Sequence, residues 1–204
     1  MDHNDLNFKS GKELAEIFTM LPKGIIQLCL SGNDLNKKTV EELVQAFSAI
    51  PNHLHSFNLN WNNMGSKTSA EFIEIFNAIP ESVSFLNMGH NWIFYYKNGS
   101  ESAEIVAAIP RGVRSLGLRD NHLCNRTGLE LMEIFSRIPK RINYLDLSNN
   151  NLNEKSATEL AGSFAALPPS IAFLNLQGNN FGNKTNQELV QIFAHLPKEI
   201  QYVW

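Results

Sequence analysis

The sequence contains only two cysteines, Cys29 and Cys124, among its 204 residues. Two isolated cysteines exclude a disulfide framework and a cysteine-rich metal site, and they are typical of a protein that does not rely on oxidation. Charge is also scarce, with 17 basic and 20 acidic residues and a net charge of −3. This balance gives no support to a nucleic-acid partner or to an anionic membrane surface as partner.

Long apolar runs are missing as well. No stretch approaches the roughly 18 apolar residues that a membrane span needs. The N-terminal segment MDHNDLNFKSGKEL lacks the basic-then-apolar layout of a signal peptide. We therefore expect a cytoplasmic protein, or one that is exported by a route without an N-terminal signal.

Motifs of the common enzyme classes are also absent. The sequence has no Gly-rich phosphate loop, no H-E-x-x-H and no nucleophile elbow. Cys29 and His55 form the one Cys–His pair that neighbouring repeats could bring together, but His55 lies next to an expected core position, where a structural histidine is the more common use. His90 and His122 lack a third ligand for zinc. We expect no catalytic residue, metal, cofactor or small-molecule substrate.

Proline, by contrast, is present at a regular period. Seven of the eight prolines are separated by 29, 29, 30, 29, 29 and 29 residues: Pro22, Pro51, Pro80, Pro110, Pro139, Pro168 and Pro197. A fixed period of this length indicates stacked structural repeats. We expect a single domain over residues 1–204, with repeat units 1–22 (partial), 23–51, 52–80, 81–110, 111–139, 140–168, 169–197 and 198–204 (partial).

Each full unit begins with the pattern I-x-x-L-x-L-x-x-N-x-L. It appears as IIQLCLSGNDL, LHSFNLNWNNM, VSFLNMGHNWI, VRSLGLRDNHL, INYLDLSNNNL and IAFLNLQGNNF. The L-x-L segment places two side chains on the buried face of a short strand. The asparagine amides can pair with backbone groups of the turn that follows. We expect these amides to form a ladder: Asn33, Asn62, Asn91, Asn121, Asn150 and Asn179.

The second half of each unit predicts a helix. It begins with a capping box, namely Ser10–Glu13, Thr39–Glu42, Thr68–Glu71, Asn98–Glu101, Thr127–Glu130, Ser156–Glu159 and Thr185–Glu188. The pattern E-L-x-x-x-F-x-x-[IL]-P then carries apolar residues at helical spacing, and the proline ends the helix. Strands lie ~4.8 Å apart whereas packed helices need ~8–10 Å, so the stack must bend with its strands inside. The sequence predicts an α/β solenoid.

These units resemble the leucine-rich-repeat family of the ribonuclease-inhibitor type. The resemblance implies a curved horseshoe with a parallel β-sheet on the concave side and α-helices on the convex side. The sequence of the units, as in YLDLSNNNLNEKSATELAGSFAALPPSI, also resembles the repeat sequences of the leucine-rich-repeat proteins that Legionella species deliver into host cells by type IV secretion. This second resemblance implies an effector in the host-cell cytoplasm that binds a host protein or restrains another bacterial effector.

The stretch NWIFYYKNGS, residues 91–100, differs from the corresponding part of every other unit. Ile93 takes the core position, whereas Trp92 replaces a residue that is polar elsewhere, and one extra residue lies among Phe94, Tyr95 and Tyr96. Because Trp61 and His90 share one repeat position, we expect an exposed aromatic rim. Alternatively, the aromatics cover the following helix, where Ser102 replaces an apolar residue.

The outward strand positions form three columns on the concave face. The first is Gln27, Ser56, Phe85, Ser115, Tyr144, Phe173 and Tyr202; the second is Cys29, Asn58, Asn87, Gly117, Asp146, Asn175 and Trp204; and the third is Ser31, Asn60, Gly89, Arg119, Ser148 and Gln177. Polar side chains with aromatic anchors suit a protein partner or an extended peptide.

All six arginines lie in the unit 111–139 or just after it. Arg114 and Arg119 are placed to form bidentate pairs with carboxylates of a partner. The alternative is a solvated cluster balanced by Asp120, Asp146 and Glu133. The predicted partner-binding residues are Trp61, Phe85, His90, Trp92, Phe94, Tyr95, Tyr96, Arg114, Arg119, Tyr144, Asp146, Phe173, Tyr202 and Trp204.

Three functions follow, in decreasing order of support from the sequence. The first is a non-enzymatic scaffold, expected to be a secreted virulence effector, that binds a protein and occludes its surface as an inhibitor would. The second is a targeting or adaptor module of a larger effector whose catalytic domain is not in this chain. The third is an enzyme that uses Cys29. The strand expected at 200–204 presents a bare sheet edge, which fits a truncation, self-association or the addition of a partner strand.

Overall fold

A computed structural model describes all 204 residues of the chain. Its strands follow the repeat and pair in parallel, in chain order, as one seven-stranded sheet. The strands are β1 (Gln27–Cys29), β2 (Ser56–Asn58), β3 (Phe85–Asn87), β4 (Ser115–Gly117), β5 (Tyr144–Asp146), β6 (Phe173–Asn175) and β7 (Gln201–Val203). From β1 to β6, each strand pairs with the residues that lie one repeat further along the chain.

Helices and strands alternate along the chain, beginning with a helix. The helices are α1 (Gly11–Thr19), α2 (Val40–Ser48), α3 (Ser69–Asn77), α4 (Gly99–Ala107), α5 (Gly128–Ser136), α6 (Ala157–Ala165) and α7 (Asn186–Phe193). All seven predicted capping boxes form, with the N-cap side chain and the Glu side chain each bonded to the other's backbone N–H. No helix is both long and apolar enough to cross a membrane.

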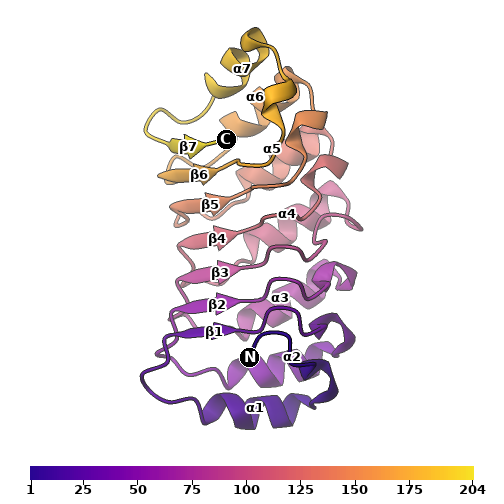
Figure 1. Ribbon diagram of the computed structural model, residues 1–204, viewed down its shortest axis with the longest axis vertical. Helices are drawn as coiled ribbons and strands as arrows, with labels where there is room; N and C mark the ends of the chain where they lie inside the picture. Colours follow the sequence, from indigo (N-terminus) through magenta and orange to yellow (C-terminus); the bar gives the residue numbers. More distant parts are fainter.

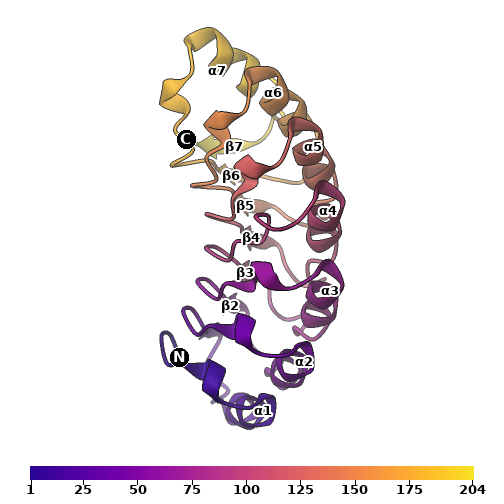
Figure 2. The ribbon, with the colours of Figure 1, turned by 90° about the vertical axis from the view of Figure 1, so that its right-hand side faces the viewer.

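The two layers bend as the strand and helix spacings predict. Figure 2 shows the chain as an arc with the strands along its inner side and the helices along its outer side, and Figure 1 shows the sheet running the length of the molecule. Leu145 and Leu174 are fully buried between the layers, whereas Tyr144 and Phe173, their neighbours in the strands, are half-buried on the concave side. The predicted α/β solenoid is confirmed.

The asparagine ladder forms as predicted and closes one edge of the core. Asn91 Nδ2 donates to the carbonyls of Leu59, Met88 and Gly89 at 2.8–3.0 Å, and its Oδ1 accepts from the Asn62 and Met64 N–H groups. The ladder asparagines are buried. Each amide therefore satisfies backbone groups of its own unit and of the unit before it, where no strand or helix bonds are available.

The register of β7 differs from the prediction. Phe173 pairs with Gln201, and Leu174 pairs with Tyr202, so Tyr202 does not extend the aromatic column and Trp204 does not follow Asn175. Instead, the Tyr202 and Trp204 rings lie 5.0 and 5.5 Å from the Phe193 ring. A shift by one residue turns every side chain of a strand to the other face, and here it packs two large rings on apolar Phe193.

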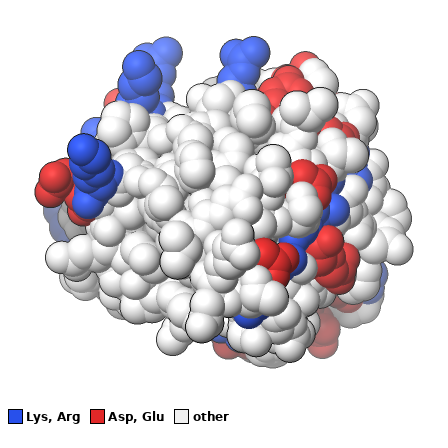
Figure 3. Space-filling model, turned by 90° about the horizontal axis from the view of Figure 1, so that it is seen from above, with Lys and Arg blue, Asp and Glu red and all other residues white.

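Figure 3 looks onto the C-terminal end of the solenoid, where most of the visible surface carries neither Lys, Arg, Asp nor Glu. Exposed apolar residues of the last unit include Val190, Tyr202 and Trp204. Charged side chains lie mainly toward the margins of this view. This end of the solenoid therefore carries few charged side chains, and part of its exposed surface is apolar.

Candidate partner-binding surface

The rim of the solenoid lies where each strand ends and the chain turns toward its helix. On either side of each ladder asparagine, the backbone has a positive φ in every full unit. The first of these positions holds Gly32, Trp61, His90, Asp120, Asn149 and Gly178, and the second holds Asp34, Asn63, Trp92, His122, Asn151 and Asn180. Gly, Asn and Asp tolerate this conformation, whereas other L-residues adopt it at a cost of about 1–2 kcal/mol. The two tryptophans are thus held in a backbone conformation that disfavours them.

Trp61 and His90 stand side by side on the rim, as predicted. Their ring centroids are 3.7 Å apart and the ring planes differ by 8°. His90 Nδ1 lies 2.7 Å from Asp120 Oδ2 of the next unit. Burial lowers the pKa of His90 below its usual value, and although the charge and hydrogen bonding of Asp120 act in the opposite direction, the effect of burial is larger.

A second aromatic group surrounds Trp92. Its ring lies 4.5 Å from the His122 ring and 5.3 Å from the Tyr95 ring, and Tyr95 in turn contacts Tyr96 edge-on at 4.7 Å. All four large aromatic residues of the rim are exposed to solvent, with relative accessibilities of 52% for Trp61, 40% for Trp92, 42% for Tyr95 and 67% for Tyr96. An exposed aromatic rim therefore exists as predicted, while its role in binding stays a prediction.

Phe94 was predicted to belong to this rim, and that prediction is wrong. The Phe94 side chain is fully buried in the core, and its N–H donates to the Asn121 carbonyl. The same backbone bond is made by Asn36, Gly65 and Cys124 in other units, so Phe94 holds an ordinary repeat position and the extra residue follows it. Ser102 is also buried, and its hydroxyl donates to the Asn98 carbonyl at 2.7 Å. Among the residues considered for the covering role, Phe94 is therefore in the core, whereas Trp92, Tyr95 and Tyr96 are exposed.

The concave face carries a second set of aromatic side chains. The rings of Tyr144 and Phe173 stack with centroids 5.3 Å apart and planes 2° apart. Burial, together with the neighbouring Asp146 carboxylate, raises the pKa of the Tyr144 hydroxyl. Asp146 Oδ1 accepts a hydrogen bond from the Ser148 N–H at 2.9 Å, so this carboxylate is held in place on the sheet surface.

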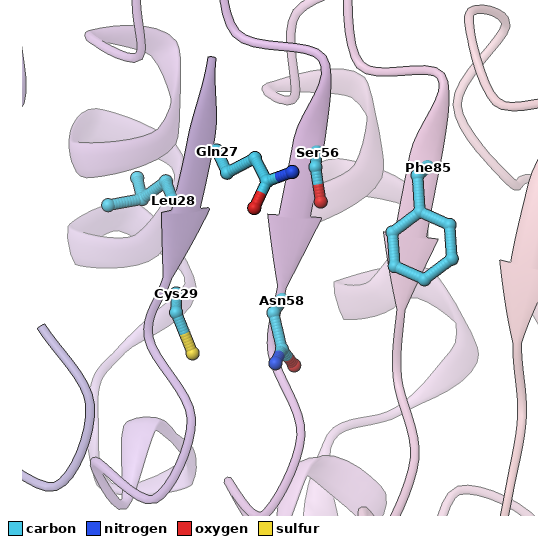
Figure 4. A pocket seen from close by; sticks show the side chains of 6 residues that line it. All are labelled: Gln27, Leu28, Cys29, Ser56, Asn58 and Phe85. Atoms are coloured by element: carbon cyan, nitrogen blue, oxygen red, sulfur yellow. The ribbon is translucent and has the colours of Figure 1, made fainter. Parts of the chain in front are cut away.

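Phe85 forms one wall of a hollow in the concave face. The hollow has a volume of about 480 Å³ and is lined by Gln27, Leu28, Cys29, Ser56, Asn58 and Phe85. Figure 4 shows these residues on three neighbouring strands, with Gln27 and Ser56 beside each other. Sequence reasoning placed most of these residues in the concave columns but did not predict a hollow, because its depth depends on which side chains are small.

Comparison with known proteins agrees with this geometry. The model of the Leucine Rich Repeat family matches residues 141–163, which contain β5, the ladder residue Asn150 and the start of α6. The solved structure of the leucine-rich repeat-containing protein LegL7 from Legionella pneumophila matches with a TM-score of 0.89 at 36% sequence identity. The chain has the leucine-rich-repeat fold. The match to LegL7 covers 96% of this chain and 62% of that protein, and no curated protein matches the chain.

Several arginines of this leucine-rich-repeat fold bond backbone carbonyls of the chain itself. Arg114 Nη1 turns back to the carbonyls of Arg111, Gly112 and Val113 at 2.8–3.2 Å. Arg141 donates to the carbonyl groups of Ile109 and Pro110. Arg119 is exposed on the concave side, where its Nε lies 3.1 Å from the Asn149 amide oxygen when that amide is turned toward it. Arg119 is therefore better placed than Arg114 to meet a partner.

Sequence reasoning missed a second ladder, which is made of basic side chains. Lys67 Nζ donates to the Lys38 carbonyl at 2.5 Å, Lys97 Nζ to the Gly65 carbonyl at 2.7 Å, and Lys184 Nζ to the Lys155 carbonyl at 2.7 Å. Burial lowers the pKa of Lys97, against the influence of Glu101 and Glu71. The signal was present in the sequence, because a Lys or Arg precedes every N-cap residue: Lys9, Lys38, Lys67, Lys97, Arg126, Lys155 and Lys184.

The residues considered for a catalytic or metal-binding site do not lie together in the structure. His55 is exposed and its Nδ1 lies 3.1 Å from the Ser82 carbonyl oxygen. Cys29 pairs in the sheet with Asn58, three residues beyond His55, and His55 does not line the concave hollow that contains Cys29. No group of three or more His, Cys, Asp or Glu side chains is arranged to hold a metal ion.

Proposed function

We propose that this leucine-rich-repeat protein is a non-enzymatic scaffold that binds another protein through its rim and concave face. The exposed cluster of Trp61, Trp92, Tyr95 and Tyr96 carries the proposal. Large aromatic side chains bury much area at low rotamer cost and are the residues that most often anchor protein interfaces. Contiguous exposed apolar surface of this kind marks an interaction site on a soluble protein.

The concave face supports the same function. Phe85, Tyr144 and Phe173 stand among amide and hydroxyl side chains on the inner side of the arc, with few charges around them. A curved solenoid brings such residues together into one extended surface. A partner seated there would lose access to the covered part of its own surface. We propose that such occlusion, rather than a reaction catalysed by this chain, inhibits the partner.

We further propose that the protein acts as a virulence effector in the host-cell cytoplasm, delivered by type IV secretion without an N-terminal signal peptide. The proposal is supported by the similarity to LegL7 of Legionella pneumophila. It is also supported by repeat units whose sequences resemble those of secreted Legionella proteins. The partner is then a host protein or another bacterial effector. Nucleic acid, membrane and small-molecule substrates are not part of the proposal, because neither surface carries a basic patch or a converging set of catalytic groups.

A capture experiment tests the proposal. The wild-type protein, a rim variant (Trp92→Ala with Tyr95→Ala) and a concave variant (Tyr144→Ala with Phe173→Ala) are used to recover partners from host lysate and from a library of co-secreted bacterial proteins. Leu129→Ala serves as control, because Leu129 is an exposed apolar residue on helix α5. We expect at least about tenfold weaker recovery with either double variant. Equal recovery of every protein by all four baits would refute the proposal.

A further inference from the structure

One side-chain position of the concave face makes the same hydrogen bond in four of the strands. At this position, in the second column, the Oδ1 atom accepts from the backbone N–H two residues further along: Asn58 from Asn60, Asn87 from Gly89, Asp146 from Ser148 and Asn175 from Gln177, at 2.9, 3.2, 2.9 and 3.1 Å. The backbone thus fixes one oxygen of each side chain. The second terminal atom makes no hydrogen bond within the chain, and it is an amide N–H donor in the three asparagines but a carboxylate oxygen in Asp146.

Asp146 is the only carboxylate in the three outward columns. It takes part in none of the ion pairs of the chain. Arg119, the only cation in the columns, lies against the Asn149 amide instead. The Asp146 side chain is half-buried, and its Oδ2 atom is open to solvent. The chain therefore leaves one carboxylate oxygen of its concave face unpaired.

A partner that covers the concave face removes the water around this carboxylate. An ionised carboxylate that loses its water without gaining a cation and hydrogen-bond donors raises the free energy of the complex strongly. None of the chain's own cations pairs with Asp146, so the compensating charge has to come from the partner. This requirement selects the chemistry of the group that the partner places over Asp146.

Two aromatic rings lie next to Asp146 on the same face of the sheet. Tyr144 precedes Asp146 by two residues in strand β5, so both side chains leave the strand on one side, about 6.6 Å apart at the backbone. Phe173 of strand β6 stacks on Tyr144, with ring centroids 5.3 Å apart. The unpaired carboxylate thus lies beside an apolar surface. Lys and Arg side chains pack their methylene groups on such a surface while the charged end reaches a polar group beyond it.

We propose that Asp146, Tyr144 and Phe173 form a site for one Lys or Arg side chain of the protein partner, an inference that rests on the function proposed above. The methylene stem packs on the two rings, and the ammonium or guanidinium group pairs with Asp146 Oδ2. A neutral N–H group would satisfy the hydrogen bond but leave an unbalanced charge under the partner. An acidic side chain would be repelled, so the site also discriminates between partners.

The Ser148 amide makes the proposal measurable by NMR, because its N–H donates to Asp146 Oδ1. The protein is titrated separately with capped Gly-X-Gly tripeptides in which X is arginine, lysine or citrulline, the neutral analogue of arginine. We expect the arginine and lysine peptides to cause a saturable shift of the Ser148 signal that weakens as salt is added. The citrulline peptide should bind at least about threefold more weakly. The Gln177 signal, from the next unit, should move less than that of Ser148.

Asp146→Asn is the decisive variant, because asparagine makes the same backbone hydrogen bond at this position in three other units, so the variant is expected to fold. It should bind the arginine peptide no more tightly than the citrulline peptide. Glu16→Gln is the matched control, since it makes the same chemical change at an exposed position of helix α1, and it should bind as the wild type does. Equal binding of the arginine and citrulline peptides, the absence of a saturable Ser148 shift, or undiminished arginine binding by Asp146→Asn would overturn the proposal.

Failure of this inference can be told apart from failure of the proposed function when Asp146→Asn is added to the capture experiment. If Asp146→Asn recovers the partner as the wild type does, while the variant with Tyr144→Ala and Phe173→Ala loses it, the scaffold function stands and the cationic contact is wrong. If the rim and concave variants both recover every protein equally, the proposed function fails whatever the tripeptides do. If Asp146→Asn loses arginine-peptide binding and recovers the partner at least about tenfold more weakly, both proposals are supported.

Discussion

The indole of Trp61 stacks on the imidazole of His90, with ring centroids 3.7 Å apart. The two residues lie 29 positions apart in sequence and share one position of the repeat. Stacking of neighbouring units in the solenoid therefore places them in contact. Both have a positive φ and neither belongs to the buried core. Residues that are costly for the backbone and lie outside the core are candidates for a functional role, so their contribution to stability can be tested separately.

This view predicts that the rim tryptophans add little to stability. Trp92→Asn relieves a left-handed backbone that costs about 1–2 kcal/mol for a non-Gly residue, and it removes ring contacts with His122 and Tyr95 that are worth about 0.5–1.5 kcal/mol each. The two effects oppose each other, so we expect the free energy of unfolding to change by less than about 1 kcal/mol. Urea denaturation measures this change. A loss above about 3 kcal/mol would show that Trp92 is needed for the fold.

Phe94 is predicted to behave in the opposite way, although it lies only two residues from Trp92. The Phe94 ring is fully buried, so Phe94→Ala leaves a cavity and should lower the free energy of unfolding by about 3–5 kcal/mol. Tyr96→Ala, at the exposed end of the same segment, should change it by less than about 1 kcal/mol. The pair is compared by urea denaturation under one set of conditions. Similar effects of both substitutions would contradict the assignment of Phe94 to the core.

The contrast between Phe94 and Trp92 shows how far sequence reasoning reaches in this protein. Positions that every unit repeats, such as the ladder asparagines and the capping boxes, are predictable because six or seven examples fix their register. The stretch from Phe94 to Tyr96 carries an extra residue that no other unit has. Its alignment is ambiguous by one place, and one place decides whether an aromatic ring lies in the core or on the surface.

The register of β7 was unpredictable for a related reason. In the earlier units, the three buried positions of the strand segment have the same spacing as Ile171, Leu174 and Leu176. The spacing is different in the last unit, because Ile200, Tyr202 and Trp204 lie on one side of the strand. The sequence QYVW alternates without a leucine to mark the inward face. Contacts with Phe193 decide the outcome, and such contacts cannot be derived from the repeat pattern alone.

The asparagine ladder supplies a further prediction. Asn91→Ala removes an amide that bonds five backbone groups, and the buried N–H groups of Asn62 and Met64, which both donate to Asn91 Oδ1, would be left unpaired. Each unsatisfied buried group costs about 1–3 kcal/mol, so the free energy of unfolding should fall by at least about 3 kcal/mol. Asn77→Ala is the control, because Asn77 is exposed at the end of α3. Comparable stability of the two variants in urea would show that water replaces the ladder.

His90 gives a prediction about pH, because burial lowers its pKa in the folded protein. In the unfolded chain His90 titrates at about 6.5, so the unfolded state takes up the proton first as the pH falls. Stability should therefore be unaffected above about pH 6.5, decline as the pH falls from there to the folded pKa, and stay level below it. The difference in urea midpoint between wild type and His90→Asn should be larger at neutral pH than at pH values below both pKa values of His90.

The groups that face His90 give this prediction its internal control. Asp120 raises the pKa of His90 through its charge and hydrogen bonding, whereas Arg119 lowers it. Asp120→Asn should therefore lower the pKa of His90 further, and Arg119→Gln should raise it, both read from the imidazole proton signals in an NMR titration. Because the His90 ring stacks on Trp61, its protonation should also shift the Trp61 indole signal with the same midpoint. A pKa of His90 above 6.5 would contradict a buried, neutral imidazole in the rim. A Trp61 signal that does not change with the titration of His90 would contradict it as well.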